Sequence, residues 1–128
     1  MKKELQDKLF EDFPILYRQH KLPMTQTCMC WGIETGSGWF DLIYKLSEAI
    51  TKLDNTIEAV QVKEKFGGLR FYISGGKEDT FRKVQALIDE AEGKSFHTCE
   101  ECSKPGKLRG VSWVVTLCDK CWKIRGMK

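Results

Sequence analysis

The chain has few of the residues on which enzymes and membrane proteins commonly depend. Its 128 residues include two histidines and three prolines, and no stretch approaches the roughly 20 apolar residues of a membrane-spanning helix. No nucleophile stands at a recognisable spacing from a base, so the sequence gives no support for catalysis. The charged start is not followed by the apolar run of a signal peptide. We therefore expect a non-enzymatic, cytoplasmic protein.

The composition is that of an ordinary folded chain, with 41% hydrophobic and 30% charged residues. Apolar residues recur at helical spacing over 2–13, over 39–53, and in a segment that begins after Asp79 or Thr80 and stops at Gly93. The segment 27–33 reads as a short strand. We predict an α+β domain over 1–94, with helices packed on a small antiparallel sheet, and a four-cysteine module over 95–128.

The segment 60–74 predicts a β-hairpin. Two strand-like runs flank Gly67-Gly68, a dipeptide that tolerates the positive φ angles of a type I′ turn. This turn would place Phe66 opposite Leu69. Side chains alternate between the faces of a strand, which gives the hairpin one apolar and one polar face. The predicted polar face carries Gln61, Lys63, Lys65, Arg70, Tyr72 and Ser74.

Four side chains of this polar face form a candidate site for a phosphate-bearing ligand: Lys63, Lys65, Arg70 and Tyr72. Arginine forks onto phosphate oxygens, lysine adds point charges, and tyrosine stacks on a base. The alternative is a solvated face, which antiparallel sheets commonly have. Glu64 lies on the predicted apolar face, where a carboxylate should pair with a cation, have a raised pKa or face a pocket, unless it sits at a wet edge.

The loop 34–39 is rich in glycine and lies between two tryptophans. Gly36-Ser37-Gly38 precedes a helix and would present backbone N–H groups to an anion, although a purely structural turn is the alternative. Trp39 is a candidate wall of a ligand pocket, with core packing as its alternative. Cys28 and Cys30 either form a second metal site with a distant histidine or remain buried thiols.

Cysteine spacing gives the strongest prediction. Two C-x-x-C pairs are separated by fifteen residues, and this pattern in a cytosolic chain indicates a metal site. We predict one structural Zn²⁺ per chain, because four thiolates leave no position for a catalytic water. Its ligands would be Cys99, Cys102, Cys118 and Cys121. A turn at the first pair, a strand over 111–117 and a short helix from Cys118 give the order of a treble-clef or zinc-ribbon finger.

Positive charge is concentrated near this site. From Cys99 to Lys128 the chain holds seven Lys/Arg and three Asp/Glu, a net charge of +4, and 1–98 hold fourteen and fifteen, a net charge of −1. The imbalance favours an anionic partner for the module. The basic side chains available for phosphates are Lys104, Lys107, Arg109, Lys120, Lys123 and Arg125.

Several segments together resemble a family of small proteins carried by bacteriophages and prophages. They are Cys30–Glu34, Gly38–Asp41, Gln61–Tyr72, Ser95–Cys102 and Thr116–Asp119. Ser103 stands where such cysteine turns often have glycine. The resemblance implies a phage origin and action in a bacterial host, and it transfers no activity.

The sequence is compatible with three functions. The first is a non-enzymatic protein that captures a nucleotide-like phosphate ligand, such as a host immune signal, in an anti-defence role. The second is a DNA- or RNA-binding accessory protein that uses the basic zinc module. The third is an inhibitor that binds a host enzyme. The sequence leaves the oligomeric state open, a homo-oligomer included.

Overall fold

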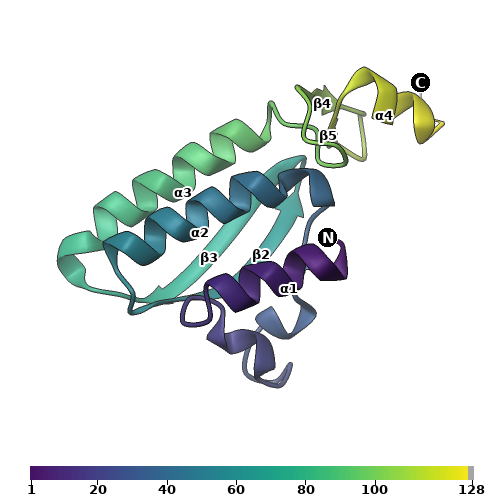
Figure 1. Cartoon of the computed structure of the whole chain (residues 1–128). Coiled ribbons are helices and arrows are strands. Elements are labelled where there is room, and N and C mark those ends of the chain that lie inside the picture. Colours follow the sequence, from purple (N-terminus) through teal and green to yellow (C-terminus); the bar gives the residue numbers. More distant parts are fainter. Residues whose placement is uncertain (127–128) are drawn as a thin grey trace.

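A computed structural model describes residues 1–126, which form helices, a three-stranded sheet and a small C-terminal module (Figure 1). The α+β class is confirmed. Met127 and Lys128, the last two residues of the predicted 95–128 module, lie outside the described residues. The elements are α1 (Lys3–Asp12), η1 (Arg18–Lys21), η2 (Met29–Trp31), β1 (Ile33–Glu34), η3 (Ser37–Trp39), α2 (Phe40–Leu53), β2 (Ile57–Lys65), β3 (Gly68–Gly75), η4 (Glu78–Thr80), α3 (Phe81–Ser95), β4 (Lys107–Arg109), β5 (Val115–Leu117) and α4 (Asp119–Ile124).

The main sheet is mixed rather than antiparallel. Its order is β1-β2-β3, with β1 parallel and β3 antiparallel to β2. The strand predicted over 27–33 is wrong for most of its length, because Met29–Trp31 forms a 3₁₀ turn. The Thr27 hydroxyl accepts a hydrogen bond from the Met29 N–H at 3.1 Å, and such local bonds compete with extended structure. In this part of the chain, Ile33 and Glu34 alone pair with β2.

The hairpin turn lies one residue earlier than predicted. Phe66 and Gly67 occupy it, with φ angles of 53° and 81°, and Lys65 pairs with Gly68. Gly68 is needed in the strand, because a Cβ there would lie 2.4 Å from the Phe96 ring. Moving a two-residue turn by one position shifts each cross-strand pairing by two residues. Because side chains alternate with a period of two, every other side chain stays on its predicted face. Phe66 leaves the apolar face and is 66% exposed.

Helices α2 and α3 cover one face of the sheet and enclose the main core (Figure 1). Tyr17 is fully buried there and hydrogen-bonds Ser47 at 2.6 Å. The stop predicted at Gly93 is wrong, since α3 continues to Ser95. The Ser95 hydroxyl accepts the Leu69 N–H at 2.9 Å, so the last helical turn is fastened to the sheet.

The buried carboxylate of Asp54 joins three elements at the far end of the body. It accepts hydrogen bonds from the backbone and hydroxyl of Thr56, from the hydroxyl of Thr80 and from the Lys77 N–H, at 2.5 to 2.9 Å. These donors hold the pKa of Asp54 well below its ordinary value. The end of α2, the start of β2 and the approach to α3 therefore share one anionic anchor.

Helices of the described chain are too short or too polar to cross a bilayer.

Candidate metal centre and polar hairpin face

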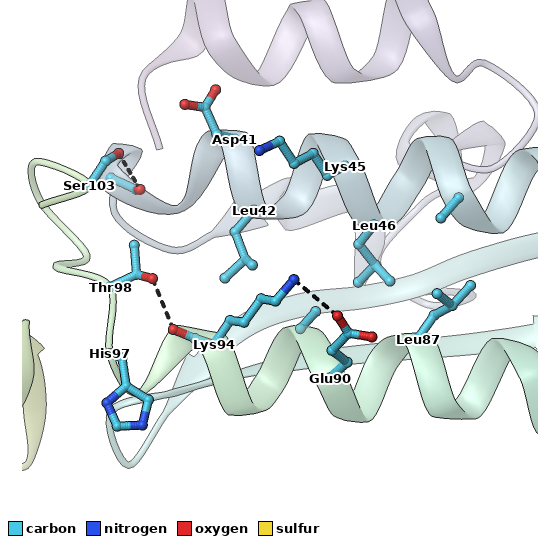
Figure 2. A pocket seen from close by; sticks show the side chains of 13 residues that line it. Asp41, Leu42, Lys45, Leu46, Leu87, Glu90, Lys94, His97, Thr98 and Ser103 are labelled. Carbon is cyan, nitrogen blue, oxygen red and sulfur yellow. Dashed lines mark hydrogen bonds and ion pairs between the residues drawn. The ribbon is translucent and has the colours of Figure 1, made fainter. Parts of the chain in front are cut away.

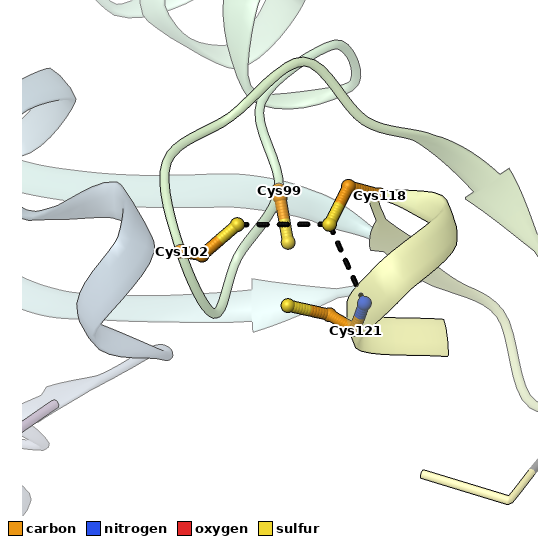
Figure 3. A group of neighbouring side chains, drawn as sticks. All are labelled: Cys99, Cys102, Cys118 and Cys121. Atoms are coloured by element: carbon orange, nitrogen blue, oxygen red, sulfur yellow. Dashed lines mark hydrogen bonds between the residues drawn. The ribbon is translucent and has the colours of Figure 1, made fainter. Parts of the chain in front are cut away.

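Four cysteines converge at the C-terminal module, as the spacing predicts (Figure 3). The sulfur atoms of Cys99, Cys102, Cys118 and Cys121 all lie within 4.8 Å of one another, and those of Cys102 and Cys118 are 3.6 Å apart. Sulfurs bound tetrahedrally to zinc at about 2.3 Å would be separated by about 3.8 Å. The cluster therefore has the dimensions of a metal site. Within residues 1–126 it is the one such group of His, Cys, Asp and Glu.

Local structure prepares the second cysteine pair to bind a cation. Cys118 caps the N-terminus of α4, and the Cys121 N–H donates to its sulfur at 3.4 Å. This hydrogen bond lowers the pKa of Cys118 to about 7. Burial raises the pKa of Cys121 to about 12, with the neighbouring sulfurs adding to the rise. The two thiols therefore differ in how readily they lose a proton. A divalent cation bound by the four sulfurs would stabilise all four thiolates, that of Cys121 included.

The first cysteine pair lies on a tight turn followed by the β4–β5 hairpin. Ser103 adopts φ 73°, a conformation that glycine takes without strain. Its hydroxyl donates to the Gly38 carbonyl of η3. Ser103 thus connects the turn that carries Cys99 and Cys102 to η3 in the body of the protein.

The hairpin of the module is shorter than predicted. Only Val115–Leu117 of the segment 111–117 forms a strand, and the side chains of Val111 and Trp113 are 98% and 70% exposed. Gly110 has φ 99° and lies against the Trp113 backbone, which makes this segment a reversing loop. Buried Leu117 and Val115 pack beside Cys99 and form the small core of the module.

The glycine-rich loop contacts the turn that carries Cys99 and Cys102. The Gly36 N–H donates to the Glu100 carboxylate at 2.8 Å, and the Gly38 N–H donates to the Glu100 carbonyl at 2.7 Å. A Cβ at either glycine would lie 2.3 to 2.4 Å from backbone oxygens of Cys99 or Glu100. The anion expected at this loop is therefore the chain's own carboxylate. Burial raises the pKa of Glu100.

Trp39 does not wall a ligand pocket. Its side chain is fully buried, and its indole N–H donates to the Thr98 carbonyl at 2.8 Å. The prediction of Trp39 as a ligand-binding residue is wrong for this structure, because no face of the ring is open to a ligand. Its partner Thr98 lies 59 residues away along the chain, a contact that leaves no local pattern in the sequence.

The two histidines and the other two cysteines do not belong to the cluster. His97 is exposed, and its backbone carbonyl accepts the Gly106 N–H. Cys28 is exposed and Cys30 is half-buried, with its thiol near the Thr27 carbonyl. His20 stacks on Phe10 at 4.1 Å between ring centroids. The second metal site therefore has no support among the described residues.

Glu64 has a structural partner at the hairpin turn. Its carboxylate accepts the Gly67 N–H at 2.7 Å and is half-buried. The paired cation that the sequence allows for is not found within residues 1–126. The carboxylate instead accepts a hydrogen bond from the backbone of the hairpin turn. At the same turn, the Thr116 hydroxyl of the C-terminal module donates to the Gly67 carbonyl at 2.6 Å.

The polar face of the hairpin keeps its predicted residues together. Lys63 pairs with Arg70 across β2 and β3, and Lys65 and Tyr72 lie on the same face. Neither lysine forms an ion pair within residues 1–126. Glu34 of β1 is the neighbour of Lys63 on its other side. Lys63 thus has a carboxylate beside it, although the two do not form a salt bridge.

An open hollow of about 640 Å³ lies on this face. Ten residues from the segment 19–28 and the hairpin line it, and none of them is acidic: Gln19, Gln26, Thr27, Cys28, Val60, Gln61, Lys63, Lys65, Tyr72 and Ser74. The lining thus includes two lysines, three glutamines and three residues with a hydroxyl group. Arg70 is absent from this lining and borders a smaller hollow between β3 and α3.

A second hollow, of about 540 Å³, lies between α2 and α3 near the module (Figure 2). Leu42, Leu46 and Leu87 form its apolar part. Its charged groups have both signs, and Lys94 is 3.0 Å from Glu90. The hollow on the hairpin face is therefore the better candidate for an anion.

Comparison with family models, with curated proteins and with solved structures gave no match to this chain.

Proposed function

We propose that the four-cysteine module holds one structural Zn²⁺ in a treble-clef-like fold. Two observations support it: thiolate is a ligand type that zinc favours, and the ligands lie on a turn and at the start of α4, with the β4–β5 hairpin between them. All four tetrahedral positions would be filled by protein. The metal would therefore stabilise the module and take no direct part in chemistry.

For the protein as a whole, we propose a non-enzymatic binding function in which the polar hairpin face captures a nucleotide-like phosphate ligand. The observation that carries this proposal is the hollow whose lining contains no carboxylate and two lysines that form no ion pair within residues 1–126. Lys63 and Lys65 would contact phosphate oxygens. Tyr72 is 43% exposed and offers its ring for stacking on a base. Amide and hydroxyl groups around them suit the ligand's sugar and base edges.

The resemblance to bacteriophage proteins suggests where such a ligand comes from. Following it, we propose that the ligand is a nucleotide signal of the host's immune response and that binding removes it from its receptor. A binding protein of this kind needs no catalytic group, in agreement with the absence of a recognisable nucleophile–base pair from the sequence. Arg70, which the sequence groups with the lysines, is secondary in this proposal because it does not line the hollow.

Isothermal titration against a panel of linear and cyclic nucleotides tests the proposal. We expect the paired change Lys63→Ala with Lys65→Ala to weaken binding by about 100-fold or more, since each charge-assisted hydrogen bond contributes about 1.5–3 kcal/mol and every 1.4 kcal/mol is a factor of about ten. The matched control, Lys52→Ala with Lys83→Ala, removes the same charge from the helices and should leave affinity unchanged. Equal affinity of all three proteins, or no binding by any nucleotide, would contradict the proposal.

Nucleic-acid binding by the module is a second candidate, and a specific observation favours it. Arg109 and Arg125 are held by Asp119 and Glu101, whereas the lysines of the module form no ion pair within residues 1–126. These lysines are Lys104, Lys107, Lys120 and Lys123. Trp113 projects from the same hairpin and offers a stacking surface.

Salt dependence separates this candidate from the first. Contacts to several phosphates release counterions, so affinity for a single-stranded oligonucleotide should fall steeply between low and physiological salt. Lys107→Ala with Lys120→Ala should reduce that slope, and the change at Lys63 and Lys65 should not. The absence of a mobility shift at low salt would exclude nucleic-acid binding.

A further inference from the structure

Within residues 1–126, no strand pairs with the outer edge of β3. The sheet order places β3 at an edge, next to helix α3 (Figure 1). Lys65 and Gly68 flank the two-residue turn and form its nearest hydrogen-bonded pair, and bonded and non-bonded pairs alternate from there. Arg70 and Tyr72 therefore direct their backbone groups toward β2. Leu69, Phe71 and Ile73 direct theirs outward.

One of these outward groups already has a partner. The Leu69 N–H donates to the Ser95 hydroxyl at the end of α3. Within the described residues, the backbone groups of Phe71 and Ile73 have no hydrogen bond outside the ladder with β2. Two N–H groups and two C=O groups thus lack a hydrogen-bond partner within residues 1–126, and an unpaired edge is a template for strand addition.

A hollow of about 360 Å³ runs along this edge between β3 and α3. Its walls carry opposite charges that do not pair with each other. Arg70 lies on the strand side and its Nε atom is buried without a hydrogen-bond partner, whereas Asp89 and Glu92 lie on the helix side. Glu92 is half-buried and takes part in no ion pair within residues 1–126.

We propose that this edge binds an extended peptide segment of a partner protein, which adds a strand to β3. Its backbone would bond the free groups of Phe71 and Ile73. Neighbouring residues of a strand point to opposite faces, so a basic side chain would turn toward Asp89 and Glu92 and an adjacent acidic one toward Arg70. The partner is thus recognised by a basic and an acidic residue placed side by side. This proposal is independent of phosphate capture by the lysines.

Amide exchange measured by NMR tests the free protein first. The amides of Arg70 and Tyr72 should exchange at least about tenfold more slowly than those of Phe71 and Ile73, because only the former bond to β2. The probe is an acetylated, amidated hexapeptide, Thr-Val-Lys-Glu-Val-Thr. Its addition should slow exchange at Phe71 and Ile73 and shift their resonances. No shift at these two amides would overturn the proposal.

Two controls make the result specific. Asp89→Lys with Glu92→Lys should weaken the probe about fivefold or more, whereas Glu48→Lys with Glu90→Lys makes the same charge change elsewhere and should not. A hexapeptide of the same composition with separated charges, Thr-Lys-Val-Thr-Val-Glu, should bind more weakly than the probe. Equal effects of both variant pairs, or equal binding of both peptides, would contradict charge recognition.

Light scattering identifies the competing occupant, a second copy of the chain. A monomer with exposed Phe71 and Ile73 amides supports peptide addition. A dimer whose Phe71 and Ile73 amides are protected without any probe would show that the edge pairs with itself, and would overturn the proposal of a partner peptide.

Discussion

The α+β body and the C-terminal module are stabilised by different means. The body has a continuous apolar core beneath α2 and α3, with a buried polar anchor at Asp54. The core of the module consists of Cys99, Val115 and Leu117 with a few half-buried neighbours. The two parts meet through hydrogen bonds at the glycine-rich loop and the hairpin turn. A segment with so small a core needs further stabilisation, which its attachment to the body supplies in part and the proposed metal would supply in part.

Metal removal should have the largest effect, and it should affect the module and the body differently. We expect Cys121→Ala or a strong chelator to unfold the module while the body stays folded, because structural zinc supplies about 10–16 kcal/mol of folding free energy in small zinc peptides. Two-dimensional NMR and elemental analysis measure both consequences. Cys28→Ser, a change at a thiol outside the cluster, should keep full metal content. A folded module without metal would break the comparison.

Loss of the Asp54 anchor should destabilise the body by about 3 kcal/mol, since a buried carboxylate with several donors is lost. The folded pKa of Asp54 lies below its unfolded value of 3.8, so its contribution is present above pH 4 and is lost as pH falls further. Denaturant unfolding of Asp54→Ala and wild type should therefore differ more at pH 7 than at pH 3. Asp41→Ala, at an exposed position, is the control. A difference that does not change with pH would refute this role.

The contact between the glycine-rich loop and the C-terminal module should be sensitive to a single added methyl group. At Gly38 a Cβ would lie 2.3 Å from the Cys99 carbonyl oxygen, so Gly38→Ala should destabilise the protein by about 2 kcal/mol. Ser37→Ala removes only an exposed hydrogen bond from the Lys2 N–H and should cost about 0.5 kcal/mol. Thermal unfolding of metal-loaded protein compares them. Equal stability of the two variants would mean that the parts do not depend on this contact.

The smallest expected effect is a gain in stability. Gly93 lies inside α3, and a methyl group added there would meet no neighbouring atom within 4 Å. Gly93→Ala should therefore raise the free energy of unfolding by about 0.5–1 kcal/mol, because alanine favours the helix over glycine. Denaturant unfolding at pH 7 measures it. A loss of stability would mean that α3 ends before Gly93 in solution, as the sequence alone suggests.

The sequence predicts what local spacing determines. It gives the four clustered cysteines, the long helices and the two faces of the hairpin, because the faces depend on a period of two and survive a turn shifted by one residue. It places the turn wrongly because Gly68 is required by packing against Phe96. The binding of Glu100 by the glycine-rich loop joins residues 64 positions apart, and no local pattern encodes it.

We propose above all that Lys63 and Lys65 hold a phosphate-bearing small molecule. Native mass spectrometry after incubation with a mixture of linear and cyclic nucleotides tests it most directly. We expect wild-type protein to carry the mass of one zinc ion and of one nucleotide, and the Lys63→Ala, Lys65→Ala protein to carry the zinc alone. Spectra in which both proteins retain the same nucleotide, or in which neither does, would contradict the claim.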